Sequence, residues 1–412
     1  MQVINKIRAY GVKTVVQYLL RNIRTRLILR SVLKTARKRP LSPVPGITVA
    51  GQLSDSGSVN KTLRDFLLAL KTAGVPYQTV DFGYKHDVHK EDCDGLLTDP
   101  KTCNLTRYTH LVELGKMPIP DGIVQHRAGI FFWEYDSGVL EAFPAIARDY
   151  DTVIAMCDFN ERYYRQVLPS NITVKKVLYP LRFVEPEVFD RVALRGKYGY
   201  SPDDFIVFFN YNFKTGYNRK NPKATILAFA KAFKDVPNAR LLFKTQKAKM
   251  FPEAVAELNA TAADLGVADR FKMIDTYIPE RDIYGLTDAC DVYISLHRGE
   301  GFGLGMAEAM SLGKPVIATN YSANTEFTVE RAAIPVPYKM VPVRSIGCDP
   351  SYYYGVKEWP EPDVDFAAAA LRKLYDSPAY AHELGARAKE FIRERYSTEN
   401  FRKSVDRFLS AP

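Results

Sequence analysis

The sequence predicts an α/β protein with two domains, each built on a parallel β-sheet with helices on both faces. Strand-like and helix-like segments alternate along the chain, and 412 residues suffice for two or three domains. A hydrophobic content of 46% and a charged content of 25% exclude a collagen-like or wholly disordered chain. We expect an arm (1–40), a first domain (41–190), a second domain (191–380) and C-terminal helices (381–412).

The arm is the source of the net charge of +10. It contains eleven Lys and Arg residues and no acidic one, which leaves 46 basic groups against the 47 acidic groups of the remaining chain. Within 3–33, apolar residues recur near helical spacing, at Val12, Val16, Leu20, Ile23 and Leu27. A basic amphipathic helix suits the surface of an anionic membrane, which is the interpretation we favour. In the alternative, its apolar stripe packs on the protein's own body or on a second subunit.

Other features of the composition indicate where in the cell the protein resides and which partners it has. No segment has the length of apolar residues that a bilayer span or a secretory signal needs. Five scattered cysteines without a C-x-x-C pair argue against disulfides and zinc, and favour a reducing compartment. We therefore expect a cytoplasmic protein, peripheral on the cytoplasmic face of the membrane. The near-neutral body argues against a nucleic-acid partner, and the oligomeric state stays open.

The alternation defines the expected elements of both domains. In the first domain we expect helices at Lys61–Ala73 and Phe159–Val167, and strands at Ile47–Ala50, Val75–Phe82, Gly129–Trp133, Thr152–Met156 and Thr173–Tyr179. In the second we expect strands at Ile206–Asn210, Arg240–Lys244, Phe271–Ile274, Asp291–Leu296 and Pro315–Ala318. Helices between these strands are expected at Pro222–Phe233, Pro252–Leu265, Glu280–Ala289 and Gly303–Leu312. Two amphipathic helices are expected in Tyr380–Leu409.

A glycine-rich segment in the second domain is the strongest functional signal. Residues 295–308 read Ser-Leu-His-Arg-Gly-Glu-Gly-Phe-Gly-Leu-Gly-Met-Ala-Glu, with a strand ending at Leu296 and a helix starting near Gly303. Ligands of open α/β sheets bind at the carboxyl ends of strands, where helix N-termini direct free N–H groups outward. Glycines let the backbone approach a ligand closely, and Glu300 and Glu308 could accept hydrogen bonds from its hydroxyls.

The two glutamates, with seven residues between them, resemble the E-x7-E signature of retaining glycosyltransferase family 4 (glycosyl transferases group 1). Further matching segments are Gly313–Thr319, Arg219–Pro222, Leu296–Arg298, Tyr321–Asn324, Trp359–Asp363, Gly51–Arg64 and Trp133-Glu134. The resemblance covers about residues 47–410 and leaves out the arm. It implies the GT-B fold, in which two Rossmann-like domains face a cleft and the C-terminal helices cross back to the first domain.

The resemblance also implies roles for single residues. Glu308 would bind the ribose hydroxyls of a nucleotide-sugar donor, Glu300 its sugar, and Lys220 its diphosphate. The family's second diphosphate-binding residue, an arginine, is replaced by Lys214, which lacks the bidentate fork, so that Arg219 or Lys244 could share the role. The turn formed by Gly301, Phe302, Gly303 and Leu304 would complete the donor site. His297 and Arg298 would either join it or only pack the loop.

The first domain is expected to contribute from the opposite side of the cleft. Gly57, before the Lys61–Ala73 helix, could approach the donor diphosphate. Glu134 could orient an acceptor hydroxyl and Trp133 could stack on a sugar, although a solvated acid and a core tryptophan are equally compatible with the pattern. We interpret His126 as structural and Asp92-Cys93-Asp94 as a surface turn rather than a metal site.

These assignments predict a retaining hexosyltransferase. It would transfer a hexose from a nucleotide-sugar to a glycan or lipid-linked glycan, as in surface polysaccharide assembly. Because cations would stabilise the leaving phosphate, no metal or other cofactor is expected. The alternative is a nucleotide-sugar epimerase or a phosphorylase of the same fold.

Overall fold

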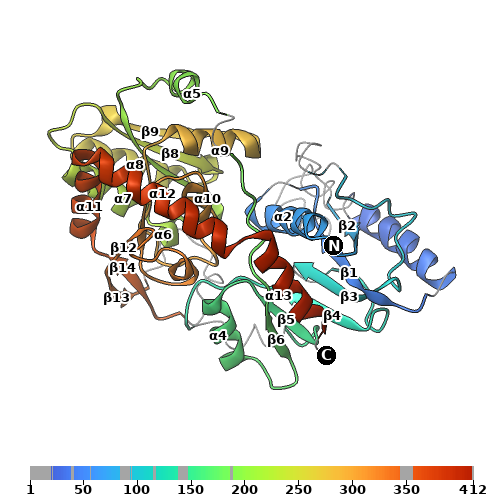
Figure 1. The fold of residues 1–412 in the computed structure, drawn as a ribbon. Coiled ribbons are helices and arrows are strands. Elements are labelled where there is room, and N and C mark those ends of the chain that lie inside the picture. The colour runs from blue at the N-terminus through green and yellow to red at the C-terminus, as the bar shows by residue number, and fades with distance from the viewer. Residues whose placement is uncertain are drawn as a thin grey trace, which may run out of the picture.

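The protein consists of two six-stranded parallel sheets covered by helices (Figure 1). The computed structural model describes residues 20, 22–38, 41–55, 57–83, 93, 95–114, 117–137, 147–185, 189–343 and 356–410. The predicted arm residues Val12 and Val16, and both aspartates of the Asp92-Cys93-Asp94 turn, lie outside these ranges. Within them, no helix is long and apolar enough to cross a membrane.

The first sheet has the strand order β2-β1-β3-β4-β5-β6. Its strands are β1 (Val44–Gly51), β2 (Tyr77–Asp81), β3 (Tyr108–Leu114), β4 (His126–Ile130), β5 (Thr152–Ala155) and β6 (Thr173–Lys176). Helices α2 (Ser58–Thr72) and α4 (Asp158–Val167) follow β1 and β5. The side chain of Cys157 caps α4 by accepting from the N–H of Asn160, and Asp158 and Glu161 place acids in its first turn, where the helix dipole favours them.

The second sheet has the order β12-β11-β10-β7-β8-β9. Its strands are β7 (Phe205–Asn212), β8 (Ala239–Gln246), β9 (Phe271–Asp275), β10 (Val292–Ser295), β11 (Val316–Thr319) and β12 (Ile334–Val336). The helices of this domain are α5 (Arg191–Lys197), α6 (Tyr217–Lys220), α7 (Pro222–Ala232), α8 (Pro252–Asp264), α9 (Glu280–Ala289), α10 (Leu304–Ser311) and α11 (Val364–Asp376). An antiparallel pair, β13 (Tyr338–Pro342) and β14 (Glu358–Pro362), stands outside both sheets.

The predicted α/β class and alternation are confirmed, but four strands (β3, β12, β13 and β14) and three helices (α5, α6 and α11) were not predicted. Strand β3 was not predicted although it lies in the middle of the first sheet, because Thr109, His110 and Glu113 interrupt its apolar pattern. Glu113 is fully buried and is ion-paired with Arg127 on the neighbouring strand, at 2.6 Å. The short edge strand β12 and the pair β13–β14 were missed as well.

Both predicted C-terminal helices are present, and they join the two domains. Helix α12 (Pro378–Arg395) packs on α10 of the second domain, and α13 (Thr398–Ser410) packs on α2 and β6 of the first (Figure 1). Lys175 of β6 donates to the carbonyl of Phe408 at 3.1 Å, and Arg402 donates to the carbonyl of Ala73 at 2.7 Å. The chain therefore returns to the first domain after completing the second.

The arm is helical over residues 22–38, and its two ends have different surroundings. Val32 and Ala36 are buried in an apolar cluster of the first domain that includes Phe82 and Leu111. In contrast, Leu20, Ile23 and Leu27 are 60%, 55% and 58% exposed. Packing on the protein's own body, the second of the two alternatives, thus holds for the C-terminal end of this helix only.

The contact between α12 and the end of α10 leaves no space for a side chain at Gly385. A Cβ at this position would lie 2.0 Å from the carbonyl oxygen of Gly313, and backbone cannot yield as a flexible side chain can. We expect Gly385→Ala to lower the free energy of unfolding by about 1–3 kcal/mol in urea titrations. Gly196→Ala is the control: this helical glycine has no atom within 4 Å of an added Cβ, so alanine should stabilise by about 0.5–1 kcal/mol.

Candidate active site

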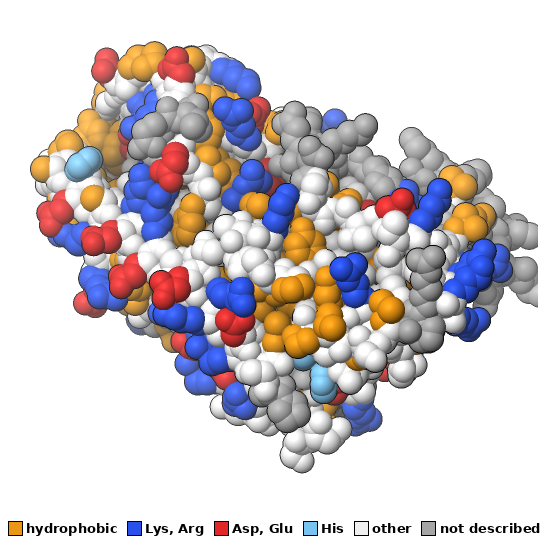
Figure 2. Space-filling view, turned by 45° about the vertical axis from the view of Figure 1, so that its right-hand side comes forward, with side chains coloured by type: hydrophobic (Ala, Val, Ile, Leu, Met, Phe, Trp, Pro, Cys, Tyr) orange, Lys and Arg blue, Asp and Glu red, His pale blue; other side chains and the backbone are white. Residues whose placement is uncertain are grey.

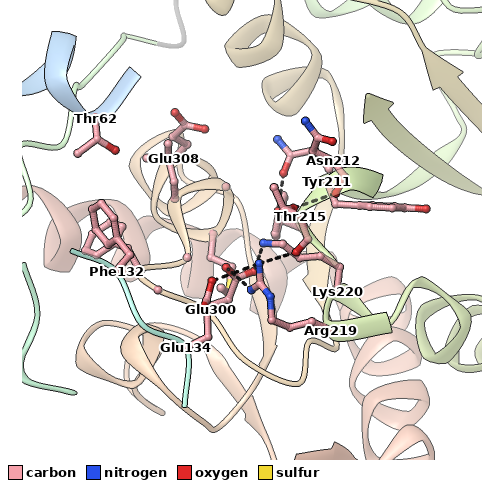
Figure 3. Close-up of a pocket in the computed structure, with 18 of the residues that line it drawn as sticks. Thr62, Phe132, Glu134, Tyr211, Asn212, Thr215, Arg219, Lys220, Glu300 and Glu308 are labelled. Carbon is pink, nitrogen blue, oxygen red and sulfur yellow. Dashed lines mark hydrogen bonds and ion pairs between the residues drawn. The ribbon is translucent and has the colours of Figure 1, made fainter. Parts of the chain in front are cut away.

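A cavity of about 290 Å³ lies between the two domains (Figure 3). Its walls come from the ends of β7 and β8, the turn after β10 and the first turns of α10, and the first domain adds Thr62, Phe132, Glu134 and Tyr179. Strands β7 and β10 are neighbours in the sheet although β8 and β9 follow β7 in the chain. The cavity therefore opens at the point where the strand order reverses, which is where open α/β sheets bind ligands.

The glycine-rich turn has a shape that disfavours larger residues at two of its positions. Gly303, which precedes α10, has a φ of 94°, in the left-handed region that favours glycine. A Cβ at Gly301 would lie 2.9 Å from the Cβ of Phe132 in the first domain. The turn thus passes close to the opposite domain and leaves the N-terminus of α10 facing the cavity.

Glu300, Lys220, Arg219 and Glu134 meet on one wall of the cavity (Figure 3). Lys220 Nζ lies 2.5 Å from a carboxylate oxygen of Glu300, and the Arg219 guanidinium lies 3.6 Å from the other. Arg219 also lies 3.5 Å from Glu134, which belongs to the first domain. One network thus joins two cations and a carboxylate of the second domain to a carboxylate of the first.

The charges of this network set the protonation of Glu300. Burial by itself favours the neutral acid, but the charges of Lys220 and Arg219 outweigh it and lower the pKa of Glu300 to about 2. Burial lowers the pKa of Lys220, an effect that Glu300 opposes. Glu300 is therefore an anion at neutral pH.

Glu308, on α10, lines the cavity at a distance from this network and close to Thr62 of α2 (Figure 3). Its carboxylate lies 3.4 Å from Lys61 Nζ and accepts a hydrogen bond from Tyr284. Burial raises the pKa of Glu308, and the charge of Lys61 opposes the shift. The two glutamates of the signature thus occupy different environments in one cavity.

Lys244 also lines the cavity, with its ammonium group held by backbone. Its Nζ donates to the carbonyl of Thr245 at 2.7 Å and to that of Thr276, after β9, at 2.6 Å. Burial lowers the pKa of Lys244 to about 8. The ammonium group ties β8 to the segment that follows β9, in addition to any role toward a ligand.

Most of the predicted site residues therefore meet. Ten of them line the cavity: Glu134, Arg219, Lys220, Lys244, Glu300, Gly301, Phe302, Gly303, Leu304 and Glu308.

The other four predicted donor-binding residues do not line this cavity, and their role toward a donor stays a prediction. Lys214 is exposed, and it is its neighbour Thr215 that reaches the wall. Gly57 is exposed before the first turn of α2. His297 is fully buried behind the turn and accepts from the N–H of Gly299, and burial lowers its pKa to about 4. Arg298 pairs with Glu361 of β14 at 2.6 Å and lines a different cavity.

Trp133 is half-buried against two apolar clusters and does not line the cavity. Its ring stacks on Tyr163 at 6.1 Å, and its indole N–H donates to the carbonyl of Ser137. The core alternative for Trp133 thus holds. His126 stacks on His110 at 4.8 Å, within the first sheet, in agreement with the structural interpretation.

The sequence analysis missed the polar wall on the side of β7 and β8. Asn210, Asn212 and Gln246 line the cavity at the carboxyl ends of these strands, and Asn210 accepts a hydrogen bond from the Tyr293 hydroxyl at 2.7 Å. Ligands of open α/β sheets bind at the carboxyl ends of strands, which is how the end of β10 was identified. The same reasoning applied to β7 and β8 would have predicted these three residues. From the first domain, Thr62, Phe132 and Tyr179 were missed as well, although Phe132 directly precedes the Trp133-Glu134 segment.

The second domain matches a known family. Residues 194–333 match the family model described as glycosyl transferases group 1. The chain carries a glycosyl transferases group 1 domain. The resemblance found in the sequence is confirmed at this level, and the narrower family 4 stays a prediction.

Relatives of known name agree with this assignment. A lipopolysaccharide core biosynthesis mannosyltransferase, LpsB of Rhizobium meliloti, is 38% identical over 71 residues, 17% of this chain and 19% of that protein. A viral protein that is named as a glycosyltransferase, from Sulfolobus islandicus filamentous virus, is 31% identical over 137 residues. The match covers 33% of this chain and 41% of the viral protein. The chain thus matches less than half the length of these relatives.

Solved structures extend the likeness to the whole fold. The Anabaena protein HepE, solved in complex with UDP and glucose, superposes with a TM-score of 0.60 at 14% identity. The match covers 89% of this chain and all of HepE. Both Rossmann-like domains are therefore shared, and the protein has the GT-B fold.

Because Lys220 lowers the pKa of Glu300, we expect the free energy of unfolding to depend on pH. The folded pKa of about 2 lies below the ordinary carboxyl value of 4.5. The pair therefore contributes stability above about pH 4.5, which is lost as the pH falls toward 2. We expect the stability advantage of the wild type over Glu300→Gln to shrink between pH 6 and pH 3.5 in urea unfolding. A constant difference across this range would contradict the assigned ionisation.

Proposed function

We propose that this protein is a retaining hexosyltransferase that uses a nucleotide-sugar donor and no metal ion. The observation that carries the proposal is the convergence of Lys220, Arg219, Glu300 and Glu308 in one interdomain cavity at the start of α10. The group 1 domain supplies the class of reaction. The complex of HepE with UDP and glucose supports a donor of that chemical type.

The chemistry of the transfer explains the residues that we assign to the donor. Cleavage of the bond between the sugar and the diphosphate leaves negative charge on the phosphate while the anomeric carbon becomes cationic. Lys220 and Arg219, with the N-terminus of α10, would stabilise that phosphate, as a divalent metal does in other enzymes. Glu300 would release Lys220 to the phosphate and accept hydrogen bonds from the sugar hydroxyls.

The first domain would receive the acceptor. Glu134 faces the second domain across the cavity and is placed to orient an acceptor hydroxyl on the side where the leaving phosphate departs. In this front-face mechanism the acceptor proton passes to the donor phosphate, so no protein nucleophile is needed. The name of LpsB supports a saccharide acceptor, which we propose to be a glycan or lipid-linked glycan of the cell surface.

We assign the exposed end of the arm helix to the cytoplasmic face of an anionic membrane. Leu20, Ile23 and Leu27 are more than half exposed, and Arg26 and Arg30 are exposed on the same helix. Basic and apolar side chains lie together at the right-hand edge of the face shown in Figure 2. Such a surface combines apolar insertion with attraction to acidic lipids.

Variants of the two key residues test the catalytic assignment. Lys220→Ala removes a charge that stabilises the leaving group, so that turnover should fall by about a hundredfold or more. Glu308→Ala removes the proposed ribose contact and should weaken donor binding and turnover together. Transfer would be measured with radiolabelled UDP-, GDP- and dTDP-sugars, after thermal shift has identified the nucleotide that stabilises the wild type.

Lys223→Ala is the matched control for these variants. Lys223 begins the helix that follows Lys220 but is exposed and pairs with Glu257 at the surface, so that it should keep full activity. Near-normal turnover of both site variants would contradict the assignment. Interconversion of the nucleotide-sugar without any acceptor would favour the epimerase alternative instead.

The membrane assignment is tested by charge reversal of the exposed end of the arm helix. We expect Arg26→Glu with Arg30→Glu to abolish sedimentation with vesicles containing 30% phosphatidylserine, because each cation near such a surface contributes about 1 kcal/mol. Deletion of the whole arm is less suitable, since it would uncover the cluster around Val32. Donor binding should stay unchanged, and undiminished sedimentation of the variant would refute this role of the arm.

A further inference from the structure

Lys61 reaches from the first domain to a signature glutamate of the second. It lies on α2, and its Nζ is 3.4 Å from the Glu308 carboxylate of α10. The same Nζ lies 2.5 Å from Asp65, one turn further along α2, and 3.5 Å from the hydroxyl of Tyr284 on α9. The side chains of Lys61, Asp65 and Glu308 are only 10%, 2% and 9% exposed.

The position of Lys61 relative to the cavity matters for its role. Glu308 and the next residue of α2, Thr62, line the cavity wall, whereas Lys61 does not. Lys61 therefore stands behind the carboxylate, and the carboxylate remains open to a ligand on its other side. A cation in this place neutralises Glu308 without occupying the ligand's position.

The surroundings of Glu308 are otherwise unfavourable for an anion. Asp65 and Glu280 add negative charge nearby, and burial favours the neutral acid. Arg64, three residues after Lys61 on α2, is ion-paired with Glu280. Among the described groups that act on Glu308, Lys61 supplies the favourable charge and Tyr284 a hydrogen bond.

We propose that Lys61 is a positioning residue for the donor: it is the counter-ion, supplied by the first domain, that keeps the ribose-binding carboxylate Glu308 ionised. The proposal rests on the proposed function, in which Glu308 binds the ribose. An ionised carboxylate offers both oxygens as acceptors to two vicinal hydroxyls and forms stronger hydrogen bonds than a neutral acid. Nucleotide affinity therefore depends on contact between the two domains.

The test compares UDP binding by Lys61→Met and the wild type at several pH values. Without its counter-ion Glu308 takes up a proton more readily, so that we expect the variant to bind UDP about tenfold more weakly at pH 6.5. The difference should shrink as the pH is raised to 9, because a higher pH favours the ionised carboxylate. Calorimetric titration supplies the ratio of the two dissociation constants at each pH, in which the titration of UDP itself cancels.

A second variant separates this role from a direct contact with the nucleotide. In a Glu308→Gln background there is no carboxylate left to ionise, so adding Lys61→Met should change UDP affinity little at any pH. Lys71→Met, at an exposed position near the end of α2, is the surface control and should behave as the wild type. Thermal melting of every variant verifies that the chain is folded.

The outcomes are distinct. A pH-independent loss of affinity, or an equal loss in the Glu308→Gln background, would show that Lys61 acts on the nucleotide directly and would overturn the proposal. Failure of the wild type to bind UDP, GDP, dTDP or ADP would instead count against the proposed function. If the wild type binds GDP, dTDP or ADP instead of UDP, that nucleotide replaces UDP as the probe and the same comparison of variants applies.

Discussion

Opposite charges buried between the two domains are the constraint on which the site depends. A buried ion is stable only when a partner of opposite charge compensates its loss of hydration. Here the partners stand on both sides of the cleft: Glu134 faces Arg219, and Lys61 faces Glu308. Each domain therefore adds a counter-charge to a group that the other domain buries, beside the partners that Lys61 and Arg219 have in their own domains. Breaking such a pair by removing one partner leaves an uncompensated buried charge, which is strongly unfavourable.

The same constraint would favour entry of the charged ligand that we propose for the cavity. Lys220 and Arg219 are compensated by Glu300 in the absence of ligand. A phosphate that takes over this compensation meets cations that are already desolvated and positioned, so little reorganisation remains. Backbone geometry completes the arrangement, because the left-handed Gly303 directs the first turn of α10 toward the cavity.

The parts of the fold and site that depend on local sequence patterns could be predicted from the sequence. The alternating elements of the second domain and the turn from Glu300 to Leu304 follow from periodicity and glycine spacing. Strand β3 escaped because Glu113 and His110 look solvated until the partner of Glu113, Arg127, is known from a neighbouring strand. Tertiary pairing here overrides the local pattern.

The predicted site residues outside the cavity wall have a related explanation. Lys214, His297 and Arg298 lie within a few residues of the wall, yet Lys214 is exposed, His297 is buried and Arg298 is paired with Glu361 of β14. Sequence proximity to a motif does not determine which side of a turn a side chain occupies. The role of Lys61 could not be predicted at all, since it depends on α2 meeting α10 across the cleft.

The distribution of charge over the chain follows from the same physics. In the body, Lys220 and Arg219 of the cavity are matched by carboxylates in contact with them, and the basic and acidic groups of the body as a whole nearly balance. The arm has no acidic residue of its own, and its exposed end carries arginines beside uncovered apolar side chains. Val32 and Ala36 fix the other end of this helix on the first domain. A membrane surface that balances the positive charge of the arm would therefore have a set orientation relative to that domain. The first domain is the one to which we assign the acceptor, so the unmatched charge of the arm and the proposed lipid-linked substrate belong to the same domain.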